Sequence, residues 1–200
     1  MSDRVTAAGE RALDDRQREA TEEVERILAA AVRVMERVAP EPPRVSDIVA
    51  EAGSSNKAFY RYFAGKDELI LAVMERGVAI VVSYLQHQMA KHQRPRDKVA
   101  CWIEGTVAQV ADPQLSSMSS AAARQMSNGP VADQEMLRPL RDLLVEPVTA
   151  LGSSDVHRDV NAVYGCTIAM MRRYMGSADR PGSTDIEHLA QFCLRGLGVD

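Results

Sequence analysis

Residues 47–69 decide the fold, and they read DIVAEAGSSNKAFYRYFAGKDEL. Two short apolar patterns flank Gly53, which is followed directly by Ser54-Ser55. Glycine is favoured just after the end of a helix, and serine is favoured at the cap that begins one. The stretch therefore predicts a helix over 44–52, a tight turn, and a second helix over 56–63. Two short helices joined by such a turn form a helix-turn-helix.

Positive charge is concentrated in this part of the chain. Lys57, Arg61 and Lys66 occur between residues 52 and 66 with no acid among them, and Arg44 precedes them. The whole chain has 24 basic and 28 acidic residues, so it is not a polycation that binds nucleic acid by bulk charge. A helix-turn-helix lays its second helix in the major groove of DNA. A local cluster of cations on a nearly neutral scaffold therefore favours specific reading of a DNA duplex.

The rest of the chain shows apolar residues at helical spacing and no alternating pattern typical of strands. The sequence predicts an all-α protein of about nine helices, with a break near Pro139 or Pro147. The expected helices cover 18–38, 44–52, 56–63, 66–90, 97–111, 115–127, 132–151, 155–175 and 184–197, the last one capped by Thr184.

Other classes of protein find little support among the 200 residues. No apolar run is long enough to span a bilayer, the N-terminus has no apolar signal segment, and the three cysteines form no Cys-x-x-Cys pair. We therefore expect a cytoplasmic protein. The sequence contains no catalytic dyad, no phosphate-binding glycine loop and no His-Glu-x-x-His, so we expect neither an enzyme nor a cofactor or metal site.

The segments DIV at 47–49, AG at 52–53, FYRYF at 59–63 and KDEL at 66–69 resemble the DNA-binding segment of the tetracycline-repressor (TetR) family. The resemblance covers about residues 26–74. It implies a helix-turn-helix domain over 18–66, a helical ligand-binding and dimerisation body over 67–200, and a homodimer. The acidic N-terminus predicts a flexible tail over 1–17, and the last two helices are apolar enough to pack against their symmetry mates.

The resemblance also implies roles for single residues. Asn56, Lys57 and Ala58 would face base edges, and Tyr60 and Tyr62 would press on the sugar-phosphate backbone. The alternative for the cations is an ordinary solvent-exposed surface without contact to DNA. The two phenylalanines of FYRYF are expected to form part of the apolar core. The full set of expected DNA-binding residues is Arg44, Ser46, Ser55, Asn56, Lys57, Ala58, Tyr60, Arg61, Tyr62 and Lys66.

The body offers candidate residues for a ligand pocket but no motif. Methionine fills irregular apolar space, so the methionine-rich body favours either an adaptable pocket or an ordinary helical core. The expected pocket residues are Trp102, Thr106, Met118, Met126, Cys166 and Met170. The resulting hypothesis is a homodimeric repressor released from a palindromic operator by a small, largely apolar ligand. The alternative is a helical protein–protein adaptor or a small-molecule-binding module without specific DNA binding.

Overall fold

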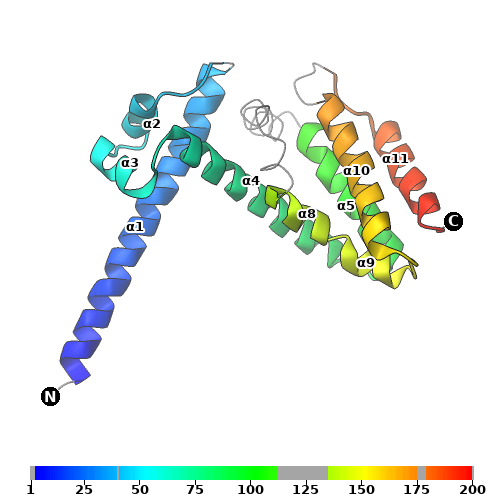
Figure 1. The fold of residues 1–200 in the computed structure, drawn as a ribbon, viewed down its shortest axis with the longest axis horizontal. Helices are drawn as coiled ribbons and strands as arrows, with labels where there is room; N and C mark the ends of the chain where they lie inside the picture. Colours follow the sequence, from blue (N-terminus) through cyan, green and yellow to red (C-terminus); the bar gives the residue numbers. More distant parts are fainter. Residues whose placement is uncertain (1–2, 40, 112–134, 175–178, 200) are drawn as a thin grey trace. The chain divides into compact units, whose positions relative to one another are not determined.

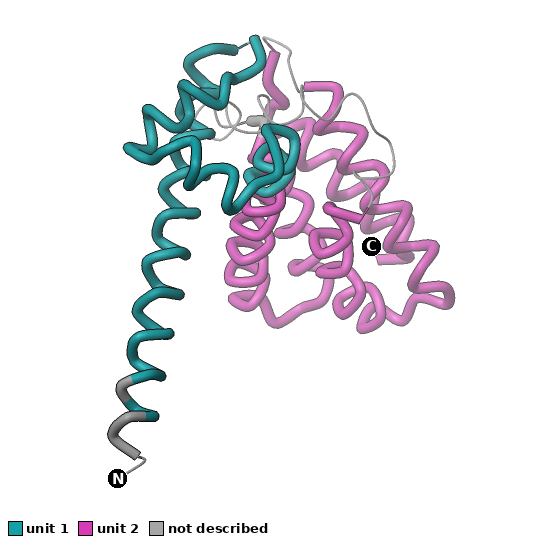
Figure 2. Tube along the Cα trace, turned by 60° about the vertical axis from the view of Figure 1, so that its left-hand side comes forward, with its two compact units in different colours: residues 1–73 teal, residues 74–200 magenta. Residues whose placement is uncertain are grey.

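The computed structural model describes residues 3–39, 41–111, 135–174 and 179–199. Within these ranges all regular elements are helices (Figure 1), which confirms the all-α prediction. The chain forms two compact units, residues 1–73 and residues 74–200 (Figure 2). The division falls inside α4 (Lys66–Met89) rather than in a loop, so one continuous helix contributes to both units. None of the helices described here is both long and apolar enough to cross a membrane.

The first unit, called the head below, is built on α1 (Asp3–Val38), α2 (Val45–Glu51) and α3 (Asn56–Tyr62). Figure 1 shows the two short helices beside the C-terminal half of α1. Apolar residues of α1 recur at helical spacing and meet those of the short helices and the start of α4. The fully buried side chains of this core are Ile27, Ala30, Ala31, Val34, Ile48, Phe59 and Leu69.

The N-terminal boundary of α1 differs from the prediction. We expected a flexible tail over 1–17, whereas α1 begins at Asp3. Residues 10–19 are exposed, so this part of the helix has no apolar stripe to reveal it. Adding residues to an existing helix is far easier than nucleating one, and Arg18 pairs with Asp15 one turn earlier at 3.6 Å. Helix propagation along a polar sequence explains the longer element.

The turn between α2 and α3 has the predicted chemistry. Gly53 adopts a φ of +60°, the left-handed conformation that favours glycine. Ser55 caps α3, because its side-chain oxygen accepts a hydrogen bond from the backbone N–H of Ala58 at 3.1 Å. These two residues fix where the first short helix ends and the second begins.

The second unit, called the body, contains the rest of α4 and the helices α5 (Pro95–Ala111), α8 (Arg138–Asp142), α9 (Val145–Ala150), α10 (Val156–Tyr174) and α11 (Ser183–Gly196). Figure 1 shows α5, α10 and α11 side by side. They enclose an apolar core around Trp102 and Ile103 of α5, to which Leu144, Val160 and Leu189 contribute. The body is therefore a helical bundle held mainly by apolar burial.

Two predictions in the body change in detail. The expected helix over 132–151 is divided: α8 has Pro139 in its first turn, and α9 begins again at Val145. The last helix is capped at Gly182 rather than by Thr184, because the Asp185 carboxylate accepts a hydrogen bond from the Gly182 N–H at 3.1 Å. The helix predicted over 115–127 lies outside the described residues.

Candidate nucleic-acid interface and ligand pocket

The exposed face of α3 carries amide, cationic and aromatic side chains. Asn56, Lys57, Tyr60 and Arg61 are all exposed, and their spacing places them on one side of the helix. The opposite side buries Phe59 in the head core. Because α3 contains no acid, this face, called the α3 face below, is suited to approach a phosphate backbone and to bond base edges.

Other predicted DNA-binding residues lie at the starts of helices. Arg44 precedes α2 and is exposed, and Ser46 is exposed in the first turn with its hydroxyl 3.3 Å from the Asp47 carboxylate. Lys66 is the first residue of α4 and is half-buried. Ser55 is exposed even though its side-chain oxygen caps α3.

Two residues of the predicted set are placed differently. Ala58 is only 5% exposed, because the third residue of α3 turns toward the head core and not toward solvent. Tyr62 is half-buried, and its hydroxyl donates a 2.9 Å hydrogen bond to the Glu23 carboxylate of α1. The Ala58 side chain therefore faces the head core, and the Tyr62 hydroxyl is bonded to another side chain of the head.

Glu23 is a residue that the sequence analysis missed. Its carboxylate accepts hydrogen bonds from Ser54 Oγ at 3.1 Å and from Tyr62, and it lies 4.0 Å from Arg61 Nη1. These partners are 31 and 39 residues away in sequence, so no local pattern connects them. The nearest signal was Ser54 itself, because a half-buried hydroxyl requires a hydrogen-bond partner.

A second carboxylate joins α1 to α2. Glu51 accepts hydrogen bonds from Arg33 Nε at 2.8 Å and from Arg37 Nη1 at 2.9 Å. The hydrogen bond from Arg33, followed by that from Arg37, lowers the pKa of the Glu51 carboxyl below its ordinary value. The pair of arginines thus holds the C-terminal end of α2 against α1 at pH values where the carboxyl is charged.

Four of the six predicted ligand-binding residues are described by the structure, and they lie in or against the core of the body. Trp102 is fully buried, and its Nε1 donates a 2.9 Å hydrogen bond to the Leu140 carbonyl. Thr106 is fully buried as well, and its hydroxyl has no hydrogen-bond partner among the residues that the structure describes. Cys166 and Met170 are partly buried against the same cluster. Met118 and Met126 lie outside the described residues.

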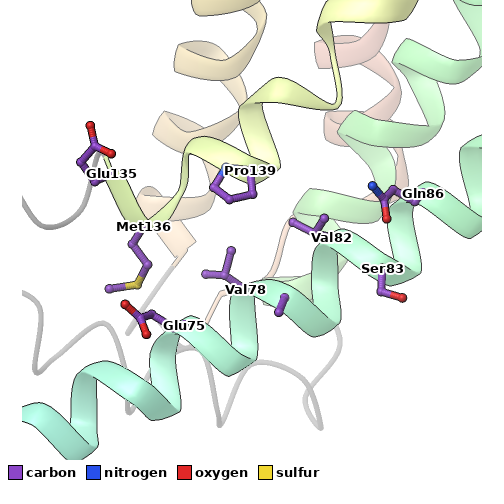
Figure 3. Close-up of a pocket in the computed structure, with 9 residues that line it drawn as sticks. Glu75, Val78, Val82, Ser83, Gln86, Glu135, Met136 and Pro139 are labelled. Atoms are coloured by element: carbon purple, nitrogen blue, oxygen red, sulfur yellow. The ribbon is translucent and has the colours of Figure 1, made fainter.

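A separate pocket lies between α4 and the segment that leads into α8 (Figure 3). Its volume is about 360 Å³. Val78 and Val82 project from α4 toward Met136 and Pro139, so the middle of the pocket is apolar. The remaining lining residues are Glu75, Ala79, Ser83, Gln86 and Glu135.

Of the predicted ligand residues, the four that the structure describes do not line this pocket. Val78 and Val82 lie in the helix predicted over 66–90, and the spacing of apolar residues along a helix is the same whether they face a core or a pocket. Among the residues that the structure describes, no group of His, Cys, Asp or Glu is arranged to hold a metal ion.

Comparison with known proteins identifies the head. Residues 27–73 match the family described as bacterial regulatory proteins, tetR family. This range includes the head core, both short helices and the start of α4. Among curated protein sequences, none matches the chain significantly.

Solved structures extend the likeness to the body. The fatty acid degradation regulator FadR from Bacillus halodurans is 20% identical, with a TM-score of 0.68 over 86% of this chain and 98% of that chain. FadR from Bacillus subtilis, in complex with stearoyl-CoA, is 18% identical, with a TM-score of 0.66 over 86% of this chain and 96% of that chain. RolR, in complex with resorcinol, is 16% identical, with a TM-score of 0.67 over 92% of this chain and 91% of that chain.

These findings agree with the geometry of the head. The matched segment contains the glycine turn, the serine cap and the α3 face, and the fold is similar to that of the solved regulators over 86% of the chain or more. Residues 27–73 thus match the DNA-binding segment of the tetR family of bacterial regulatory proteins, and the chain has the fold of these solved regulators.

Proposed function

We propose that this regulator is a homodimeric repressor that reads a palindromic operator through α3 and is released by a small, largely apolar ligand bound in the body. The observation that carries the DNA-reading part is the α3 face, on which Lys57 and Arg61 flank Tyr60 with no acid in the helix. Because its target is bacterial DNA, we place the protein in the cytoplasm.

The exposed residues of the head divide naturally between bases and backbone. Asn56 and Lys57 lie at the N-terminal end of α3, the end that enters the major groove in helix-turn-helix proteins. An amide suits adenine and an ammonium suits guanine. Tyr60 and Arg61 lie one turn later and are assigned to the sugar-phosphate backbone. Further phosphate contacts are assigned to Arg44, Ser46, Ser55 and Lys66.

The last two long helices support a dimer. On α10 the exposed positions Ala162, Gly165 and Ala169 are small and recur on one face, which permits close approach of another helix. On α11 Phe192 is 57% exposed, although a large aromatic side chain gains by burial. Pairing of α10 and α11 with their symmetry mates would form a four-helix interface and bring two heads to one operator.

The body pocket supports an effector. Solved structures of this fold contain stearoyl-CoA in one case and resorcinol in another, both of them compounds with large apolar or aromatic parts. The pocket described here, of about 360 Å³, is at the lower end of the range for small-molecule sites. Val78 and Val82 line it from α4, the same helix that begins at Lys66 in the head. A ligand that favours one position of α4 would therefore change the affinity for DNA.

Selection of bound sequences from a random duplex library tests this function. The full chain is mixed with the library, and the enriched sequence is then titrated at two salt concentrations against a scrambled duplex. A palindromic site bound far more tightly than the scrambled duplex is the expected result. Weak binding without enrichment, which disappears as salt rises, would contradict specific reading by the α3 face.

The effector is then sought with the selected duplex as reporter. Small aromatic and acyl compounds are added to the protein–duplex complex, and release is followed by fluorescence anisotropy. Replacement of Val82 by Asp is expected to abolish release, because a carboxylate in the apolar middle of the pocket opposes ligand entry. Replacement of the exposed lining residue Gln86 by Glu is the milder comparison.

A further inference from the structure

One carboxylate of α1 makes contact with both ends of the α3 helix. Glu23 Oε1 accepts from Ser54 Oγ at 3.1 Å, in the turn just before α3. Glu23 Oε2 accepts from the hydroxyl of Tyr62, the last residue of α3, at 2.9 Å. The Glu23 side chain is 23% exposed, so these hydrogen bonds are partly shielded from water. Charge-assisted hydrogen bonds of this kind are stronger than neutral ones.

The contact matters because α3 is short. It has seven residues, and an isolated helix of that length is not stable in water. Its orientation therefore depends on what it packs against. Ala58 and Phe59 anchor the middle of α3 in the core, and Phe63 is buried directly after its last residue. Glu23 adds a polar restraint that joins both ends of the helix to α1.

We propose that Glu23 is a positioning residue for DNA recognition, which holds α3 by both ends and thereby sets the discrimination between operator and other DNA. It touches no base itself. It acts through Ser54 and Tyr62, so the role of the Tyr62 hydroxyl is to secure α3 to α1. The inference rests on the proposed function in one respect, namely that the α3 face is what reads the bases.

Glu23 also bears on the charge of the α3 face. Arg61 Nη1 lies 4.0 Å from Glu23 Oε2, and the guanidinium carbon lies 5.6 Å from the centroid of the Tyr62 ring. The carboxylate therefore offsets part of the Arg61 charge before DNA arrives. A phosphate must compete with Glu23 for Arg61, which lowers affinity for all duplexes alike and leaves discrimination to the base contacts.

Three variants of the full chain separate these effects. Glu23→Ala removes the carboxylate, Tyr62→Phe removes only the hydroxyl, and Glu22→Ala makes the same change of charge at an exposed neighbouring position. The measurement is the ratio of dissociation constants for a scrambled duplex and for the duplex selected by the unaltered chain. Glu23→Ala and Tyr62→Phe are expected to lower this ratio about tenfold, as the loss of a charged hydrogen bond implies. Glu22→Ala is expected to leave it unchanged.

The salt dependence of binding distinguishes the two variants from each other. Glu23→Ala frees Arg61 for a phosphate, so the slope of log affinity against log salt is expected to steepen by up to about 0.9. Tyr62→Phe leaves the carboxylate in place and is expected to keep the original slope. Glu23→Gln removes the charge but keeps an acceptor, so it is expected to recover part of the discrimination while keeping the steeper slope.

A measurement without DNA keeps the inference separate from the proposed function. Backbone amide hydrogen exchange over residues 56–62 of the free protein is expected to speed up in Glu23→Ala and Tyr62→Phe and not in Glu22→Ala. Unchanged exchange there overturns the positioning role, whether or not any operator is found. Altered exchange with an unchanged discrimination ratio overturns the link from position to specificity. Failure of the unaltered chain to enrich any duplex would count against the proposed function instead.

Discussion

The head and the body of this chain hold their helices together by different means. In the head, short helices are joined to α1 by two carboxylates, Glu23 and Glu51, in addition to the apolar core. In the body, the long helices pack around Trp102, whose indole makes one buried hydrogen bond. The difference follows from size, because a small unit buries less apolar surface per residue. The orientation of the short head helices therefore depends on a few polar contacts beside the core, whereas the body helices are held mainly by apolar burial.

The largest expected effect comes from deleting a core side chain in each unit. Trp102→Ala is expected to destabilise the body by about 3–5 kcal/mol, since it leaves a cavity and removes the hydrogen bond to the Leu140 carbonyl. Phe59→Ala is expected to cost a similar amount in the head, where the ring packs on Phe63 and Tyr60. Chemical unfolding followed by circular dichroism gives the free energies.

DNA binding separates the two deletions. Phe59→Ala is expected to abolish operator binding while most of the helix signal remains, because the body makes up the larger part of the described helices. Trp102→Ala is expected to lose far more helix signal. Equal loss of helix signal in both variants would show that the two units unfold together, and it would contradict the separate stabilisation of head and body.

Alanine substitutions at one glycine of each unit are expected to have a smaller effect on stability, for a different physical reason in each unit. A Cβ at position 105 would lie 2.5 Å from Leu85 Cδ2, so Gly105→Ala overpacks the contact of α5 with α4. After the helix preference of alanine is subtracted, we expect about 1–2 kcal/mol of destabilisation. Gly53→Ala meets no neighbour but must adopt a φ of +60°, which costs roughly 1–2 kcal/mol.

The cause of the cost can be tested at each glycine. Leu85→Ala in the Gly105→Ala background makes room for the new methyl group, so the double variant is expected to lose less than the sum of the two changes. Gly53→Asn is expected to be milder than Gly53→Ala, because asparagine tolerates a positive φ. Strict additivity at position 105, or an equal cost of alanine and asparagine at position 53, would contradict these assignments.

The outcome of sequence reasoning differed between the units for the same physical reason. In the head, the cap, the turn and the cations of the predicted helix-turn-helix all lie in one short stretch around α3. The structure confirms that Gly53 forms the turn and that Ser55 caps α3. The contacts that the local sequence could not predict are those between residues far apart in the chain. Glu23 is joined to Tyr62 across 39 residues, and Ala58 faces inward because of how α3 packs.

In the body, the spacing of apolar residues predicted most of the helices but not which helices pack against one another. The helix predicted over 155–175 corresponds to α10, and its buried residues Val160, Val163 and Thr167 recur at helical spacing. The pocket was not identified, because Val78 and Val82 look like core in a one-dimensional pattern. The division between α8 and α9 was expected from the prolines, but its position depends on how the chain returns to the core.

Two lysines test the charge of the head on DNA. Lys57→Ala is expected to cost about 1–3 kcal/mol on the selected duplex and to relax specificity, because this residue is assigned to a base edge. Lys66→Ala is expected to weaken selected and scrambled duplexes alike and to flatten the salt slope by about 0.9, as the loss of one phosphate contact requires. Titrations of both duplexes at several salt concentrations measure these effects. If Lys57→Ala weakens both duplexes equally, its assignment to a base is wrong.

The smallest expected effect is the pH dependence of the joint between α1 and α2. Arg33 and Arg37 lower the pKa of Glu51 below its ordinary value of 4.5. A carboxyl with a lowered pKa in the folded state stabilises the fold at pH values above 4.5, and this contribution is lost as the pH falls through 4.5 toward the folded value. Glu51→Gln is therefore expected to lower the urea midpoint at neutral pH and to flatten its decline in acid.

The matched change Glu41→Gln, at an exposed position outside this joint, is expected to leave the curve unchanged. Because both arginines are more than half exposed, the difference should be small, and parallel curves for Glu51→Gln and the unaltered chain would show that core packing alone holds α2.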